Sequence, residues 1–105
     1  MKDIKQYKDG KRDGYWEEYF SNGVLACKGW HKDDKKHGYW EDYYRSGKPF
    51  YLGSFKEGKK EGVWEWFHIN GELDSMGLYK NNIKVGYWET YAENGEFLNK
   101  KFYLR

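Results

Sequence analysis

The sequence has little of what usually stabilises a small domain. Its 105 residues include one proline and one cysteine, Cys27, so no internal disulfide forms and no set of zinc ligands can be assembled around the thiol. No apolar run approaches the roughly 18 residues that a membrane helix needs, and the opening MKDIKQYKDG lacks the apolar stretch of a signal peptide. These absences predict no transmembrane segment and favour a cytoplasmic, reducing setting.

Charge of a single sign is also scarce. Nineteen basic and 17 acidic residues leave a net charge of +2, which gives no general attraction to nucleic acid or anionic lipid. What the chain has instead is aromatic residues, with 6 Trp, 11 Tyr and 6 Phe. Each aromatic side chain can bury roughly 150 to 250 Å². They can therefore replace an aliphatic core if they share one surface.

The sequence aligns with itself at a shift of 24 residues without a gap, which makes it a single repeat domain. A half repeat, 1–13, precedes repeats 14–37, 38–61, 62–85 and 86–105. Each repeat begins with a glycine, followed two positions later by tryptophan and then by glutamate. The recurring residues are Gly14, Gly38, Gly62 and Gly86; Trp16, Trp40, Trp64 and Trp88; and Glu17, Glu41, Glu65 and Glu89.

Each repeat is typical of a β-hairpin. A stretch such as GYWEEYF is aromatic-rich without helical spacing and ends in an Asn-Gly or Ser-Gly pair, which supplies the positive φ of a tight hairpin turn. We predict an all-β fold, an elongated, twisted, single-layer antiparallel meander of about nine strands extending roughly 40 Å. The strands are expected near 3–8, 14–20, 25–32, 38–44, 49–56, 62–68, 73–80, 86–92 and 97–104.

The unit G-x-W-E-x-aromatic-x-x-(Asn/Ser)-G, followed by (Tyr/Phe)-K-x-G-K-x-x-G, resembles the MORN repeat, specifically the bacterial variant of YwqK-like antitoxin proteins. The resemblance implies a module that binds other proteins or lipids and, in the antitoxin branch, a toxin as partner. Three positions depart from the pattern, and the repeats that contain them are expected to turn differently or to fray. Asp34 and Asn82 replace the turn glycine seen at Gly10 and Gly58, and Lys101 replaces the glycine of Gly29, Gly53 and Gly77.

Alternation along a strand places the tryptophans on one face and Tyr15, Glu17 and Tyr19 on the other. The tryptophan row is interpreted as structural, because residues present in every repeat usually stack one repeat on the next. Function is expected where the repeats differ and on the exposed aromatic face. The candidate partner-binding residues are Tyr15, Tyr39, Tyr87, Glu17, Glu41, Glu65 and Glu89, together with Trp66 and His68 on the tryptophan face.

No catalytic residue, metal site or cofactor is predicted, so the protein is not expected to be an enzyme. Paired carboxylates can perform acid and base chemistry, but equivalent glutamates lie about 9.6 Å apart in similar surroundings. Hydrogen bonds to neighbouring Tyr, Lys or backbone groups are the favoured role, with a ligand-facing acidic stripe as the alternative. His31, His37 and His68 fall at three different phases of the repeat, and Cys27 lacks a nearby base.

The second turns gather lysines along one long edge of the sheet. This lysine edge comprises Lys8, Lys11, Arg12, Lys32, Lys35, Lys36, Lys56, Lys59, Lys60, Lys80 and Lys84, diluted by acidic residues. It is either a solvated edge that opposes aggregation or a contact for an acidic partner, nucleic acid or anionic lipid.

The C-terminal edge, 97–105, is expected to be adhesive through Phe97, Phe102 and Tyr103. Three interpretations remain open: strand addition by a partner, a weak end-to-end dimer, and further repeats in a longer parent chain. The leading hypothesis is a non-catalytic protein-binding repeat module of the antitoxin or immunity type that neutralises a toxin. The alternative is a scaffold or adaptor that binds anionic lipid or nucleic acid through the lysine edge.

Overall fold

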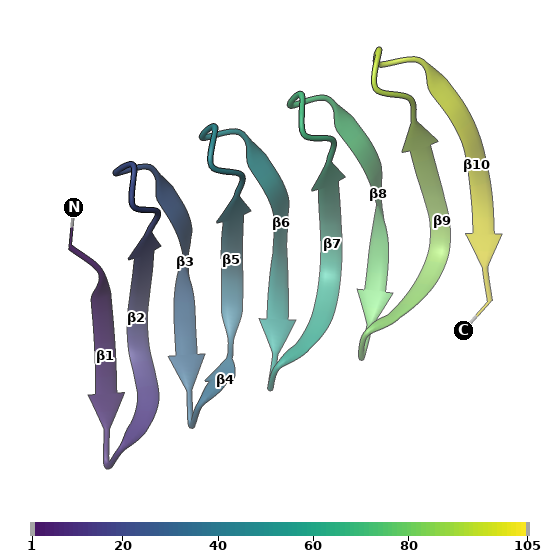
Figure 1. Ribbon diagram of the computed structural model, residues 1–105. Coiled ribbons are helices and arrows are strands. Elements are labelled where there is room, and N and C mark those ends of the chain that lie inside the picture. Colours follow the sequence, from purple (N-terminus) through teal and green to yellow (C-terminus); the bar gives the residue numbers. More distant parts are fainter. Residues whose placement is uncertain (1, 105) are drawn as a thin grey trace.

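The computed structural model describes residues 2–104 as one open antiparallel β-sheet (Figure 1). Its Cα extents of 45 × 35 × 11 Å are those of an elongated single layer, so the predicted all-β meander is confirmed. Met1 and Arg105 lie outside the described residues, so the predicted edge 97–105 is described through Leu104. The strands are β1 (Ile4–Lys8), β2 (Lys11–Tyr19), β3 (Leu25–Lys32), β4 (Lys35–Lys36), β5 (Gly38–Tyr43), β6 (Pro49–Lys56), β7 (Lys59–Phe67), β8 (Leu73–Lys80), β9 (Ile83–Tyr91) and β10 (Phe97–Tyr103).

Each strand pairs with its neighbour along the chain, apart from the two-residue β4, which pairs with β3 beside β5. Strands β2, β7 and β9 begin three residues earlier than predicted, at Lys11, Lys59 and Ile83. The reason is that the turns preceding them contain only two residues, so pairing starts at once. Ahead of repeat 38–61 this early pairing survives only as β4, which His37 separates from β5.

The tight turns lie at the opposite end of the hairpins from the one predicted. At the lysine edge, both residues of each two-residue turn have positive φ, as in type I′ turns. At the Asn-Gly and Ser-Gly end, the strands are joined by longer loops in which only the glycine has positive φ, as at Gly23. There the Asn22 Oδ1 accepts a hydrogen bond from the Val24 N–H at 3.0 Å, so the asparagine holds the loop as an Asx turn.

Asp34 and Asn82 do not change the turns, contrary to the expectation from their replacement of glycine. Their φ values of 69° and 71° match those of Gly10 and Gly58, because short Asx side chains tolerate the left-handed region. Each also makes a contact that glycine cannot. The Asp34 Oδ1 accepts from the Arg12 N–H at 2.7 Å, and the Asn82 Oδ1 accepts from the Lys60 N–H at 2.8 Å.

The core is a row of tryptophans that crosses the sheet on one face. Trp16, Trp40, Trp64 and Trp88 are buried, at 5% exposure or less. Each of the last three indoles lies over a glycine of the preceding strand, respectively Gly29, Gly53 and Gly77. A Cβ at any of these glycines would lie 2.2 to 2.3 Å from the ring carbons, so only glycine leaves room for the rings at these positions.

Lys101, at the equivalent position in the last repeat, does not cause fraying through Tyr103. It pairs with Trp88, and β10 continues to Tyr103. No described strand places an indole over this position, so a side chain is accommodated there. Lys5 stands to Trp16 as Gly29 stands to Trp40, on the strand before the indole, so a side chain occupies the position that the later repeats leave bare. Accordingly, the Trp16 Nε1–H donates to Glu18 at 2.8 Å, whereas the Trp40 Nε1–H donates to the Trp30 carbonyl of the preceding strand.

Candidate functional site

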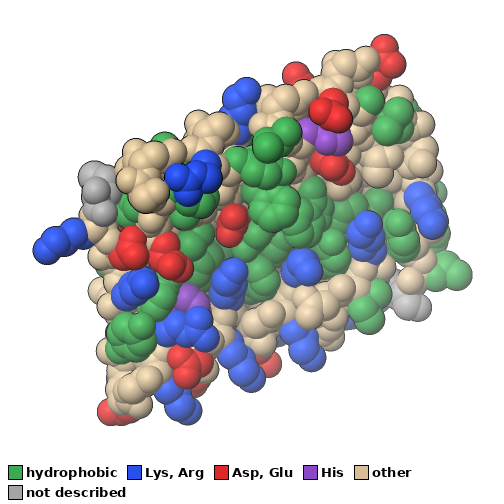
Figure 2. Space-filling view, viewed as in Figure 1, with side chains coloured by type: hydrophobic (Ala, Val, Ile, Leu, Met, Phe, Trp, Pro, Cys, Tyr) green, Lys and Arg blue, Asp and Glu red, His purple; other side chains and the backbone are tan. Residues whose placement is uncertain are grey.

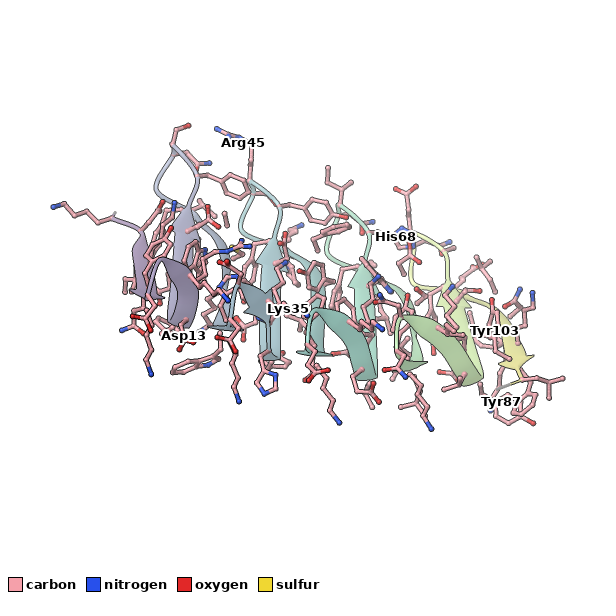
Figure 3. All side chains as sticks on the ribbon, turned by 90° about the horizontal axis from the view of Figure 1, so that it is seen from below. Asp13, Lys35, Arg45, His68, Tyr87 and Tyr103 are labelled. Carbon is pink, nitrogen blue, oxygen red and sulfur yellow. The ribbon has the colours of Figure 1, made fainter. Side chains whose placement is uncertain are left out.

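The two faces of the sheet have different surfaces, named here the Trp face and the Tyr face. On the Trp face, basic side chains cross a continuous hydrophobic band (Figure 2). The Tyr face carries Tyr15, Glu17 and Tyr19 and their equivalents. Tyr87 and His68 project to opposite sides of the sheet (Figure 3). The candidate residues of the sequence analysis therefore do not form one site, because Trp66 and His68 are separated from the others by the sheet itself.

Trp66 and His68 are both engaged in contacts within the protein. The Trp66 indole packs at 5.4 Å from Tyr51 and from Trp64, and its Nε1–H donates to the Tyr79 hydroxyl at 3.2 Å. The His68 Nε2 donates to the Tyr91 carbonyl at 2.8 Å, and its Nδ1 lies 3.4 Å from Asp74. These contacts tie adjacent repeats together, and both side chains also line a shallow hollow on the Trp face with Phe50 and Asp74.

Three lysine side chains lie over the tryptophan row. Lys36 lies 4.6 Å from the Trp40 ring, Lys60 5.8 Å from Trp64 and Lys84 4.7 Å from Trp88, all within cation–π range. The Lys36 ammonium also donates to the Tyr51 hydroxyl at 3.1 Å. These three lysines of the predicted lysine edge therefore pack against the core and cover part of the tryptophan row.

On the Tyr face, tyrosine hydroxyls bind the recurring glutamates. The Tyr15 and Tyr19 hydroxyls both donate to Glu17, the Tyr43 hydroxyl donates to Glu41, and the Tyr91 hydroxyl donates to Glu89 at 2.9 Å. Burial, followed by the hydrogen bond to Glu17, raises the pKa of Tyr15 to about 12. The same hydrogen bonds lower the pKa of Glu17. These glutamates hold the face together and lack the asymmetry of a catalytic pair.

Glu65 is the exception among the four glutamates. Val63 and Phe67 stand where the other repeats have tyrosine, so no tyrosine hydroxyl lies two residues away on its strand. Its cross-strand partners are Leu52 and Met76, both apolar. Among residues 2–104, no side chain forms a hydrogen bond or ion pair with the Glu65 carboxylate. A half-buried carboxylate in an apolar setting is thus presented near the middle of the Tyr face.

An apolar row crosses the Tyr face beside the glutamates. Tyr39, Val63 and Tyr87 are exposed by 51%, 60% and 61%. Their strand neighbours extend the row through the pairs Tyr15 with Trp30, Val63 with Leu78 and Tyr87 with Phe102. Trp30, Leu78, Leu52 and Met76 were missed by the sequence analysis because the second strand of each repeat varies. Counting alternation outward from a two-residue turn would have placed them on this face.

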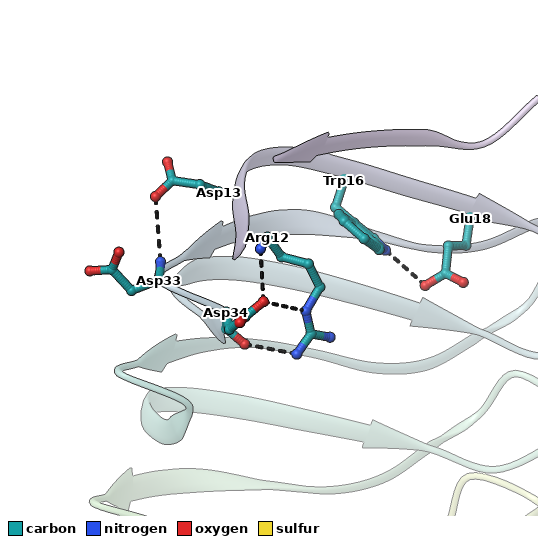
Figure 4. A network of polar contacts seen from close by, with 6 residues as sticks. All are labelled: Arg12, Asp13, Trp16, Glu18, Asp33 and Asp34. Carbon is teal, nitrogen blue, oxygen red and sulfur yellow. Dashed lines mark hydrogen bonds and ion pairs between the residues drawn. The ribbon is translucent and has the colours of Figure 1, made fainter. Parts of the chain in front are cut away.

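The lysine edge carries its own counter-charges. The Arg12 guanidinium donates to Asp34 from Nε at 3.2 Å and from Nη2 at 2.9 Å, and the Asp33 N–H donates to Asp13 (Figure 4). The hydrogen bond from the Arg12 backbone, followed by that from its side chain, lowers the pKa of Asp34. A shallow hollow there is lined by Lys8, Lys11 and Lys32 together with acidic side chains. The edge is therefore a mixed surface rather than an unbroken basic one.

Cys27 and His31 have the environments of packing residues. Burial, followed by the nearby carboxylates of Glu18 and Asp42, raises the pKa of the Cys27 thiol to about 12. His31 is buried edge-on between Trp16 and Trp40 at 4.7 and 4.9 Å. Burial lowers the pKa of His31, followed by the charges of Arg12 and Lys36. Both groups are held neutral, which suits packing.

The part of the chain that the structure describes contains no group of three His, Cys, Asp or Glu side chains arranged to hold a metal ion. It also contains no helix that is long and apolar enough to cross a membrane.

Comparison with known families agrees with the hairpin repeat. The family model of the MORN repeat variant matches residues 12–32, 36–57 and 60–81, more than half of the chain. The chain belongs to the MORN repeat variant family. The MORN hairpin formed by β9 and β10 lies beyond the matched segments but continues the same sheet. MORN repeats are generally modules that bind proteins or membranes. No curated protein is significantly similar to this chain.

Proposed function

We propose that the chain is a non-catalytic protein-binding module that holds its partner against the Tyr face. The observation that carries the proposal is the exposed apolar row around Glu65, a carboxylate without an internal donor in the described residues. Aromatic side chains on a rigid surface are the residue types that dominate binding hot spots. The sheet has the size such contact needs, because its 45 × 35 Å extent exceeds the roughly 800 Å² that one partner buries in a standard interface.

The chemistry of Glu65 specifies what the partner presents. A Lys or Arg side chain placed over Leu52, Met76 and Val63 would pair with the carboxylate while its stem covers the apolar neighbours. Removing one member of an ion pair that is buried at an interface leaves the other charge buried without a partner, which weakens binding strongly. We therefore infer a partner with a basic residue surrounded by apolar ones.

The proposed biological role is that of an antitoxin or immunity protein, and the partner is a toxin whose surface is blocked by the sheet. The support for this finer role is the resemblance of the repeat to that of YwqK-like antitoxin proteins. The role needs no catalytic residue, since neutralisation by occlusion requires only affinity and coverage. The alternative role is a scaffold or adaptor that binds anionic lipid or nucleic acid through the lysine edge.

The test is affinity capture from the native cell with the wild-type chain and with the Tyr39→Ala, Glu65→Lys double variant. One stoichiometric protein should be recovered with the wild type, and its affinity should fall more than about 30-fold in the double variant, from a hot-spot loss of about 2 kcal/mol. Tyr7→Ala is the matched control, because Tyr7 is 59% exposed but packs beside Trp16 on the Trp face.

Expression of the captured protein alone should stop growth, and co-expression of the wild-type chain should restore it. Unchanged capture by the double variant would place the contact elsewhere. A captured protein that is harmless to the cell would retain the binding function but remove the antitoxin role. No stoichiometric partner, with normal growth after deletion of the gene, would overturn both.

A further inference from the structure

The two edges of the sheet are not equally protected. Among residues 2–104, β10 pairs only with β9, so the backbone groups on its outer side have no strand partner. Strand β1, at the other edge, is interrupted by a register shift between Lys5 and Tyr7. In strand β10 the register shift lies at the start, between Phe97 and Asn99, and the strand is regular from Asn99 to Tyr103. A strand can therefore be added more readily to β10.

The repeat shows what a strand beside β10 would have to present. Lys28, Leu52 and Met76 occupy equivalent positions in successive repeats, and each faces a glutamate on the following strand. In the first case, the Lys28 Nζ lies 3.8 Å from the Glu41 carboxylate. Lys100 is the equivalent residue in the last repeat. Its inner neighbour is Glu89 on β9, and its outer side corresponds to the position that Glu41 fills for Lys28.

Lys101 removes one requirement of the repeat. Within the sheet, each of three strands places a tryptophan over the glycine equivalent to Lys101, where a Cβ would lie within 2.3 Å of the ring. At the other edge, Lys5 holds this position, and Trp16 pairs with it with its ring 5.5 Å from the Lys5 Nζ. A strand that pairs with β10 therefore needs no tryptophan opposite Lys101, and an acidic residue there would complement the charge.

We propose that β10 accepts an antiparallel strand of the partner protein, with glutamate opposite Lys100. This inference rests on the proposed protein-binding function and adds a second contact to it. Pairing between copies of the chain is disfavoured, because β1 and β10 each contain two lysines and no acidic residue. Like charges placed opposite each other across a strand pair are destabilising.

The probe is a nine-residue peptide, KHGYAEDYY, which copies residues 36–44 with alanine in place of Trp40. In this register its glutamate falls opposite Lys100. Fluorescence anisotropy should show binding to the full chain, and hydrogen exchange should slow at amides of β10 but not of β1.

Charge reversal tests the register. Lys100→Glu should weaken binding of the peptide up to about tenfold, and a peptide with lysine in place of the glutamate should recover it. Lys8→Glu on β1 is the matched control of equal charge and should leave the affinity within about twofold. The Tyr39→Ala, Glu65→Lys variant should bind the peptide like the wild type, which separates this contact from the Tyr face.

Three results would overturn the inference. Absence of peptide binding, or protection at a site other than β10, would show that the edge is inert. If Lys8→Glu and Lys100→Glu weaken peptide binding equally, the loss of affinity reflects net charge and not pairing with β10. A concentration-dependent dimer in sedimentation, with β10 amides protected, would make a second copy the occupant. If the peptide does not bind while partner capture still depends on Tyr39 and Glu65, the edge contact fails and the proposed function stands.

Discussion

Gly53 lies directly beneath the indole of Trp64, and a Cβ built on it would be 2.3 Å from the ring carbon Cδ2. The same relation joins Gly29 to Trp40 and Gly77 to Trp88. In a single-layer sheet no second layer exists to bury large rings, so these three tryptophans are buried against the bare backbone of the preceding repeat. The stability of the sheet thus depends on contacts between neighbouring repeats.

Gly53→Ala should therefore destabilise the protein more than an ordinary surface substitution does. The added methyl forces the Trp64 ring or the strand to move, which should lower the free energy of unfolding by about 1 to 3 kcal/mol. Urea unfolding followed by tryptophan fluorescence measures the change. Lys101→Ala is the matched control at the equivalent position of β10 and should change stability by less than about 0.5 kcal/mol. Equal losses in the two variants would show that the glycine contact is not responsible.

His31→Phe should reduce the dependence of stability on pH below neutrality. Burial keeps the pKa of His31 below its usual 6.5 in the folded chain. The unfolded chain therefore binds a proton first as pH falls, so His31 makes the folded state less stable on going from about pH 7.5 to 5.5. Phenylalanine fills the equivalent slot at Phe55, so the variant has a precedent in the fold.

Charged groups around His31 also shift its pKa, and the titration of a neighbouring carboxylate also changes the stability. Arg12 and Lys36 lower its pKa, whereas Asp34 and Glu18 raise it. The pKa of Asp42 is raised, mainly by burial, so its titration makes the fold more stable as pH falls. Urea unfolding at pH 5.5, 6.5 and 7.5 compares the variant with the wild type. Parallel curves for the two proteins would show that His31 does not contribute.

Cys27 should be nearly unreactive in the folded protein. Raising the pKa of the thiol from 9.0 to about 12 lowers the thiolate fraction at neutral pH about a thousandfold. Alkylation by iodoacetamide at pH 8 should therefore be at least about 100-fold slower in the folded chain than in urea. Mass spectrometry of the time course measures both rates. Comparable rates in the two states would identify an accessible thiolate and reopen a chemical role for this cysteine.

The lysine edge should not retain the protein on anionic surfaces at physiological salt. Arg12 is held by Asp34, whereas Lys36, Lys60 and Lys84 lie over aromatic rings, and acidic side chains lie among the other lysines, so the positive charge of the edge is partly offset. Flotation with phosphatidylserine vesicles and titration with a single-stranded oligonucleotide check this at about 0.15 M salt. Binding that persists at this ionic strength and weakens as salt is added would favour the adaptor role.

The repeat, the strand content and the side of the sheet on which each recurring residue lies could all be predicted from the sequence. A fixed period of 24 residues and strict alternation along a strand are local properties, and they require no knowledge of which strands meet. That Trp16 and Glu17 lie on opposite faces of the sheet follows from this alternation alone. The C-terminal edge, with Phe97 and Phe102 exposed, followed from the polarity of the last repeat.

Features that depend on the register between strands could not be predicted and came from the folded sheet. Two-residue turns at Asp33 and Asp34 and at Asn81 and Asn82 could not be assigned from composition, since their positive φ arises where strand twist selects it. Glu65 lies between Leu52 and Met76, which is known only from the pairing of the strands. The pairing also shows that Trp66 and His68 lie apart from the tyrosines. Pairing brings together residues that the sequence keeps ten or more positions apart, and only the folded sheet specifies which ones meet.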